Sequence, residues 1–146
     1  MFGQAHRKPW RHKNTSTNKG GTIRWDKKLK AGQMVYTDQL VSAQPGLVPQ
    51  EKGSATRARI WGATVFVDGA TDYTKVHLME HATGDSTLEA KAAFERDAMS
   101  RGVDIRGYHA DNGRYAEHLF RDDCKQKSQS LNFCGVGAHH QNGIAE

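Results

Sequence analysis

The sequence predicts an α/β fold with a mixed sheet, preceded by a polar arm. Three runs of β-branched and aromatic residues, separated only by loop or turn residues, indicate consecutive strands. Helical patterns then alternate with further strand patterns, as in α/β domains. Residues 1–31 are instead polar, basic and poor in aliphatic side chains, which favours an arm or linker. The remaining residues, 32–146, are enough for one domain with its own core.

The first three strands are expected at residues 33–41, 59–67 and 73–79. A loop over residues 42–56, which contains two Pro and two Gly, separates the first two strands. A turn over residues 68–72 separates the second from the third. Because both connections return the chain without a helix, we expect antiparallel pairing.

A helix is expected next, because Ser86 and Glu89 have the spacing of a capping box and Gly102 is placed to end the helix. The remaining elements are expected at residues 103–109 (strand), 115–127 (helix) and 130–136 (strand). Three antiparallel strands followed by helix–strand–helix–strand is the order of the ribonuclease H-like fold. In that fold the later strands extend the sheet through right-handed crossovers.

The net charge of +5 is distributed unevenly. Residues 1–30 carry nine Lys and Arg against a single Asp, whereas the rest of the chain carries twelve against fifteen Asp and Glu. Lys27, Lys28 and Lys30 end this basic segment and are candidate nucleic-acid contacts. A solvated tail that binds nothing has the same charge pattern, so charge alone leaves both interpretations open.

Several classes of protein are not expected from this composition. No apolar run approaches the length of a membrane span, and the charged N-terminus lacks the apolar segment of a secretory signal. Cys124 and Cys134 have no second pair that would suggest a disulfide framework. We expect two reduced, buried thiols in an intracellular protein.

Three carboxylates are candidate catalytic and metal-binding groups. Asp38 lies inside the first strand, where burial is costly unless the group is paired or metal-bound; a water-facing or ion-paired Asp is the alternative. Asp111 begins an Asp-Asn-Gly turn after a strand, at the edge where α/β sheets place ligand groups, although the tripeptide is also a common turn. Glu146 follows 35 positions later. Asp68 and Asp72 are rivals, but turn chemistry explains both.

Such a triad has the oxygen donors that hold two divalent cations, so Mg²⁺ is expected and Mn²⁺ could substitute. Zinc is not expected, because the adjacent His139 and His140 have no Cys or His at ligand spacing. The polar residues near the carboxylates are candidate phosphate or base contacts, with plain loop structure equally open. These residues are Asn112, His139, His140, Gln141 and Asn142.

Residues 33–146 resemble the integrase catalytic core of copia-type retrotransposons, within the retroviral integrase superfamily. The resemblance rests on four segments: Tyr36-Thr37-Asp38, residues 66–73 (FVDGATDY), residues 109–113 (HADNG) and residues 135–146 (GVGAHHQNGIAE). It implies that Asp38, Asp111 and Glu146 bind the catalytic metals and that Asp68 is structural. It also implies DNA as partner, a homo-oligomer in the intact protein, and action in the nucleus after assembly in cytoplasmic particles.

The resemblance further implies that the chain is a piece of a retrotransposon polyprotein. Residues 1–31 would be the tail of a zinc-binding segment whose ligands precede Met1, and the core would be truncated at Glu146. Asp38 and Asp111 are 73 positions apart, more than in retroviral enzymes, and the loop after the first strand would absorb the extra length. The expected reaction is metal-dependent joining of element DNA 3′ ends to target DNA. Another ribonuclease H-like nuclease, or an inactive nucleic-acid-binding remnant, remains an alternative.

Overall fold

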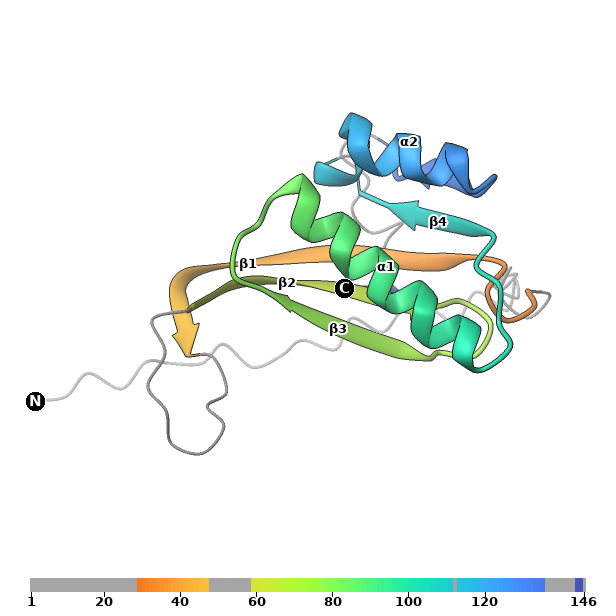
Figure 1. The fold of residues 1–146 in the computed structure, drawn as a ribbon, viewed down its shortest axis with the longest axis horizontal. Coiled ribbons are helices and arrows are strands. Elements are labelled where there is room, and N and C mark those ends of the chain that lie inside the picture. The colour runs from red at the N-terminus through yellow and green to blue at the C-terminus, as the bar shows by residue number, and fades with distance from the viewer. Residues whose placement is uncertain (1–28, 48–58, 112, 136–143, 146) are drawn as a thin grey trace, which may run out of the picture.

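A five-stranded mixed sheet forms the centre of the protein, and its strand order is β3-β2-β1-β4-β5 (Figure 1). The computed structural model describes residues 29–47, 59–111, 113–135 and 144–145. The strands are β1 (Val35–Leu47), β2 (Arg59–Asp68), β3 (Thr74–Met79), β4 (Gly107–Ala110) and β5 (Ser130–Phe133). β1, β2 and β3 pair antiparallel, whereas β4 and β5 run parallel to β1. The predicted ribonuclease H-like fold class is therefore confirmed.

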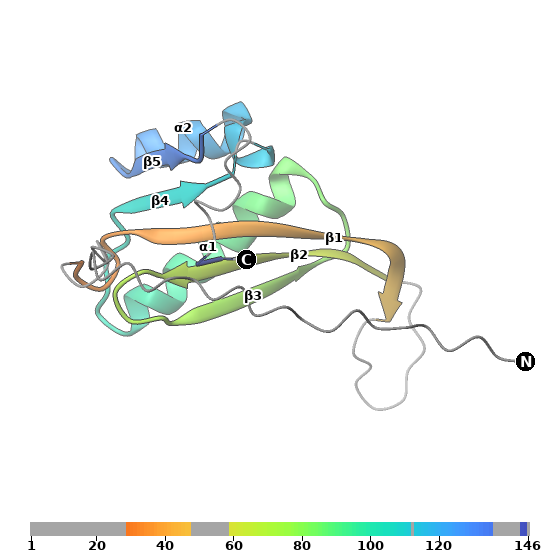
Figure 2. The same ribbon diagram turned by 180° about the vertical axis from the view of Figure 1, so that it is seen from behind.

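Two helices, α1 (Gly84–Ser100) and α2 (His118–Gln126), pack on one face of this sheet (Figures 1 and 2). A short 3-10 helix, η2 (Arg114–Ala116), precedes α2. The core between the layers is largely aromatic: Phe66 of β2 stacks on Phe94 of α1 with ring centroids 4.9 Å apart. Both helices therefore hold the strands through the same buried layer.

Side-chain alternation along β1 decides which residues reach this core. Thr37 pairs with Phe66 and is fully buried on the helix side, so the next residue, Asp38, projects from the opposite face. That opposite face also carries exposed apolar side chains, among them Leu40, Val76 and Leu78. Among the described residues, no helix covers it. Asp38 thus lies on the open side of the sheet.

The strand lengths differ from those predicted. β1 continues to Leu47 instead of ending at residue 41, because Gly46 and Leu47 resume pairing with the start of β2 after a register shift. Pro45 lies within that irregular stretch, where the lack of its N–H is tolerated. β4 and β5 are shorter than expected, beginning at Gly107 and ending at Phe133 respectively.

The predicted capping box at the start of α1 is wrong. Thr83 is the N-cap residue: its backbone is extended and its side chain accepts a hydrogen bond from the Ser86 amide at 3.2 Å. Ser86 therefore lies in the first helical turn, three positions after the cap. At the other end, Gly102 adopts a φ of 75°, so its predicted role in ending the helix is confirmed.

α2 begins at His118 and not at residue 115, because the segment before it forms η2. Both cysteines are buried and free, as expected. In the described part of the chain, no helix is both long and apolar enough to cross a membrane. The division between an arm and a core at residue 31 stays a prediction, since the described residues begin at Leu29.

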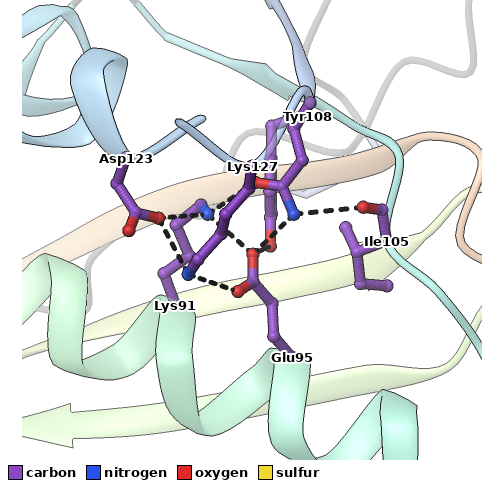
Figure 3. Close-up of polar contacts among 7 residues, drawn as sticks. Lys91, Glu95, Ile105, Tyr108, Asp123 and Lys127 are labelled. Atoms are coloured by element: carbon purple, nitrogen blue, oxygen red, sulfur yellow. Dashed lines mark hydrogen bonds and ion pairs between the residues drawn. The ribbon is translucent and has the colours of Figure 1, made fainter. Parts of the chain in front are cut away.

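A buried lysine joins the two helices to the sheet (Figure 3). Lys91 of α1 has no exposed surface, and its Nζ donates to Glu95 at 2.6 Å, to Asp123 of α2 at 2.5 Å and to Gln129 at 2.6 Å. The same Nζ lies 5.0 Å from the centroid of the Tyr108 ring of β4. We call this group the Lys91 cluster; its members are Lys91, Glu95, Tyr108, Asp123, Lys127 and Gln129.

Candidate active site

The two predicted carboxylates of the described chain occupy neighbouring positions in the sheet. β1 and β4 lie side by side and parallel, and their last paired residues are Thr37 and Ala110. Asp38 and Asp111 are the next residue on each segment, at the carboxyl end of β4. Both residues are half-buried. Residues 73 positions apart in the sequence therefore meet at one sheet edge, where α/β folds place their ligand groups.

Local hydrogen bonds fix Asp38 from both sides. Its Oδ1 accepts a hydrogen bond from the Gln39 amide at 2.8 Å. Its two neighbours point to the helix side, where Thr37 donates to the Tyr115 hydroxyl at 3.0 Å and Gln39 Nε2 donates to Thr87 Oγ1 at 3.3 Å. The strand segment that carries Asp38 is thereby anchored while the carboxylate itself projects from the open face.

Tyr115 lies in η2, on the side of β1 opposite the Asp38 side chain, with 2% of its surface exposed. Burial raises the pKa of Tyr115; hydrogen bonds from the Thr37 and Thr64 side chains oppose the rise, and the negative charge of Asp38 adds to it. The phenol is therefore neutral throughout the physiological pH range. Sequence reasoning missed this residue, although its position just after the Asp-Asn-Gly turn was a usable signal.

A Cys–His contact lies beside Asp111 and was also missed. The Cys134 amide donates to Ala110 O at 3.1 Å, which places Cys134 alongside the end of β4. Its Sγ lies 3.4 Å from His109 Nε2, and the His109 ring lies 5.4 Å from the Tyr36 ring. Burial lowers the pKa of His109, so the imidazole is neutral at pH 7. No local sequence pattern signalled this contact, because the parallel pairing of β4 with β5 creates it.

The rival carboxylate Asp68 has a structural role, as turn chemistry predicted. It is 4% exposed, and its Oδ1 accepts from the Gly32 amide at 2.9 Å. Its Oδ2 accepts from the Thr71 hydroxyl at 2.6 Å and from the Thr71 amide at 3.1 Å. The carboxylate closes the β2–β3 turn and ties it to the segment before β1.

The structure does not bring Lys30 to this edge. Lys30 is exposed and bonds through its backbone to Gln33, before β1 begins. It therefore lies at the amino end of the parallel strands, opposite the end that carries Asp111. The other predicted site residues lie outside the described residues: Lys27, Lys28, Asn112, His139, His140, Gln141, Asn142 and Glu146.

The donor chemistry of the site suits a hard divalent cation. Asp38 and Asp111 supply carboxylate oxygens, which Mg²⁺ and Mn²⁺ prefer, and the softer Cys134 and His109 contact each other. Within the described ranges, no group of three or more His, Cys, Asp or Glu side chains could hold a metal ion. The two carboxylates thus fit such an ion as part of a site, and the predicted third ligand, Glu146, lies outside the described residues.

The fold is that of retroviral integrase catalytic cores. A chain of the simian T-cell lymphotropic virus intasome in complex with PP2A regulatory subunit B56 gamma superposes with a TM-score of 0.58 at 12% identity, over 77% of this chain and 35% of that chain. The HTLV-2 integrase catalytic core domain with magnesium gives TM-scores of 0.52 (dimeric form) and 0.51 (trimeric form), both at 16% identity. These matches cover 72% and 79% of this chain and 62% and 67% of the HTLV-2 chains.

At these identities the similarity shows the fold alone. The chain spans about a third of the length of the intasome chain and about two thirds of the HTLV-2 cores. No protein-family model matches the sequence, and no curated protein matches it.

Proposed function

We propose that this chain is the catalytic core, or part of it, of an integrase-type polynucleotidyl transferase that joins DNA 3′ ends to a target DNA. The observation that carries the proposal is the adjacency of Asp38 and Asp111 at the carboxyl edge of the parallel strands. This adjacency occurs in a fold shared with integrase cores, one of which, from HTLV-2, was solved with magnesium in two forms. The sequence motifs around both carboxylates, Tyr36-Thr37-Asp38 and residues 109–113, resemble those of copia-type integrases and support the same assignment.

Asp38 and Asp111, with Glu146 as the expected third ligand, would hold Mg²⁺ or Mn²⁺. When bound, such ions activate an attacking oxygen and stabilise a leaving oxygen at a phosphodiester. In the overall reaction the oxygen of a DNA 3′ hydroxyl forms a bond to the target phosphorus, and the bond from that phosphorus to the target 3′ oxygen breaks. The proton of the attacking hydroxyl passes to solvent, and the leaving oxygen takes up a proton.

The residues around the carboxylates contribute orientation. Thr37 and Gln39 anchor the strand on both sides of Asp38, so the backbone that carries the carboxylate is already in place before a metal ion binds. No helix of the described residues covers the side of the sheet that Asp38 faces, which suits a polymeric substrate, and the basic residues within 1–30 would add sequence-independent phosphate contacts.

The finer assignment is a copia-type retrotransposon integrase, present here as a piece of a polyprotein. This finer assignment rests on the sequence motif of residues 135–146 and not on the fold. It carries the further proposals that the intact protein is a homo-oligomer, that its substrates are element ends and target DNA, and that it acts in the nucleus. The zinc-binding segment implied before Met1 belongs to the same proposal.

A catalytically inactive nucleic-acid-binding remnant is the second candidate. The observation that favours it is the charge of residues 1–30, nine Lys and Arg against one Asp, because phosphate binding needs no catalytic triad. Such a protein would bind DNA with a steep salt dependence and show no Mg²⁺-dependent turnover. A nuclease of the same fold would cut DNA without joining it, so the nature of the product separates these candidates.

The test is a strand-joining assay with labelled DNA ends, target DNA and Mg²⁺, using the chain and the longer protein that contains it. Asp111→Asn should abolish joining and leave DNA binding intact, because the amide does not supply the anionic ligand. Asp104→Asn is the matched control, since this carboxylate is exposed at the opposite edge of the sheet. Joining by Asp111→Asn at the level of Asp104→Asn would refute the proposal.

A further inference from the structure

A buried side-chain hydrogen bond adds to the strand pairing between the two segments that carry the carboxylates. The Thr37 hydroxyl donates to the Tyr115 hydroxyl at 3.0 Å, and both residues are buried, with 0% and 2% of their surfaces exposed. Thr37 directly precedes Asp38, and Tyr115 follows Asp111 by four positions. The bond therefore ties β1 to η2 on the helix side of the sheet, away from the Asp38 side chain.

Tyr115 lies in a closed turn that begins at Gly113. The Ala116 amide donates to Gly113 O at 3.1 Å, which makes the turn that contains Tyr115. The Tyr115 ring packs edge-on against Phe120 of α2, with centroids 5.2 Å apart and an interplanar angle of 80°. Because the ring is held by this packing, its hydroxyl is a fixed point for Thr37 to bind.

The electrostatics give a second link between this tyrosine and the site. The negative charge of Asp38 contributes to the raised pKa of Tyr115, so the carboxylate and the phenol interact although they lie on different sides of β1. A neutral phenol tolerates this neighbour, whereas a phenolate would repel it. The Tyr115 hydroxyl therefore stays protonated and available for its hydrogen bond with Thr37.

We propose that Tyr115 is a positioning residue: through Thr37 its hydroxyl sets the placement of Asp38 relative to Asp111 and so the affinity of the pair for a divalent cation. The inference rests on the proposed function. Tyr115 itself reaches neither the cation nor the substrate. Outer partners that orient carboxylate ligands in this way typically account for about tenfold or more in metal affinity.

The experiment measures Mn²⁺ binding to the full chain by titration, with free Mn²⁺ followed by electron paramagnetic resonance. The test variants are Tyr115→Phe and Thr37→Val, each of which removes one partner of the bond with little change in volume. The matched control is Tyr108→Phe, another buried tyrosine, whose hydroxyl donates to Glu95 at 2.9 Å away from the carboxylates. Thr37→Ser keeps the hydroxyl and tests rescue.

Tyr115→Phe and Thr37→Val should each weaken Mn²⁺ binding about tenfold, whereas Tyr108→Phe and Thr37→Ser should bind as the wild type does. Thermal unfolding in EDTA measures the stability of each variant without metal. Tyr108→Phe loses a comparable hydrogen bond and should lose stability, but its Mn²⁺ affinity should stay unchanged. Wild-type affinity in both test variants would overturn the positioning role alone. If the wild type shows no Mn²⁺ binding that Asp111→Asn abolishes, the proposed function is overturned, and this inference with it.

Discussion

Lys91 Nζ lies 2.5 Å from Asp123 Oδ2 and thereby joins α1 to α2 inside the protein. The ammonium group has no exposed surface, yet three acceptors and the face of the Tyr108 ring surround it. A buried charge is tolerated only with such complete compensation. Lys91 therefore helps to position α2 against α1, together with the aromatic core that contains Phe120.

Replacing this lysine should destabilise the protein strongly. Lys91→Ala removes the buried cation and opens a cavity, while Lys127 still pairs with Glu95 and Asp123, so the free energy of unfolding should fall by about 2–5 kcal/mol. Urea denaturation followed by circular dichroism measures this change. Lys125→Ala, which alters an exposed lysine of α2, should change it by less than about 0.5 kcal/mol. Equal losses in the two variants would show that the Lys91 cluster contributes little.

Acid should weaken the same cluster. Burial alone would raise the pKa of Glu95, but hydrogen bonds from Lys127, Lys91 and Gln129 outweigh it and hold the pKa at about 2, below its ordinary value of 4.5. A carboxyl whose pKa is lowered in the folded state contributes stability above its unfolded pKa. That contribution is lost as the pH falls from about 5 towards 2.

Urea denaturation at a series of pH values between 7 and 3 measures this dependence. Glu95→Gln should lower the free energy of unfolding at pH 7 and flatten its decline below pH 5, because the titrating group is gone. An acid decline as steep as that of the wild type would assign the pH dependence to other groups.

The turn carboxylate Asp68 should matter for folding and not for metal binding. Asp68→Ala leaves the Gly32 and Thr71 amides without their acceptor in a buried site, so the free energy of unfolding should fall by about 2–4 kcal/mol. Asp72→Asn is the control, because Asp72 is exposed with a φ of 58°, a conformation that Asn also adopts. Thermal denaturation without Mn²⁺ measures the loss of stability, and the change in melting temperature on adding Mn²⁺ measures metal binding. A loss of Mn²⁺ affinity in folded Asp68→Ala would contradict the structural role.

The strands of the first half were predictable because local patterns determine them. β2 and β3 lie within one residue of their expected bounds, since β-branched runs and a short turn contain the necessary information. The start of α1 was misplaced because two polar residues three positions apart, Thr83 and Ser86, both have capping chemistry, and only backbone conformation distinguishes them. The extension of β1 past residue 41 depends on pairing with distant residues.

The candidate site was predictable only in part. Asp38 and Asp111 could be named from sequence, but their adjacency depends on the parallel pairing of β1 with β4, which no local spacing specifies. The Thr37–Tyr115 bond and the Cys134–His109 contact follow from the same non-local pairing. Lys91 was not recognisable as buried, because a lysine in a helix rich in charged residues ordinarily faces water.

The alternation along β1 has a consequence for how this protein tolerates change over evolutionary time. Thr37 faces the buried tyrosine and Asp38 faces the open side, so inserting or deleting one residue between Val35 and Asp38 would exchange the two faces. The carboxylate would then point into the core, and the hydroxyl would lose Tyr115. A single-codon insertion there should therefore be more damaging than most substitutions, although every residue of the strand would be retained.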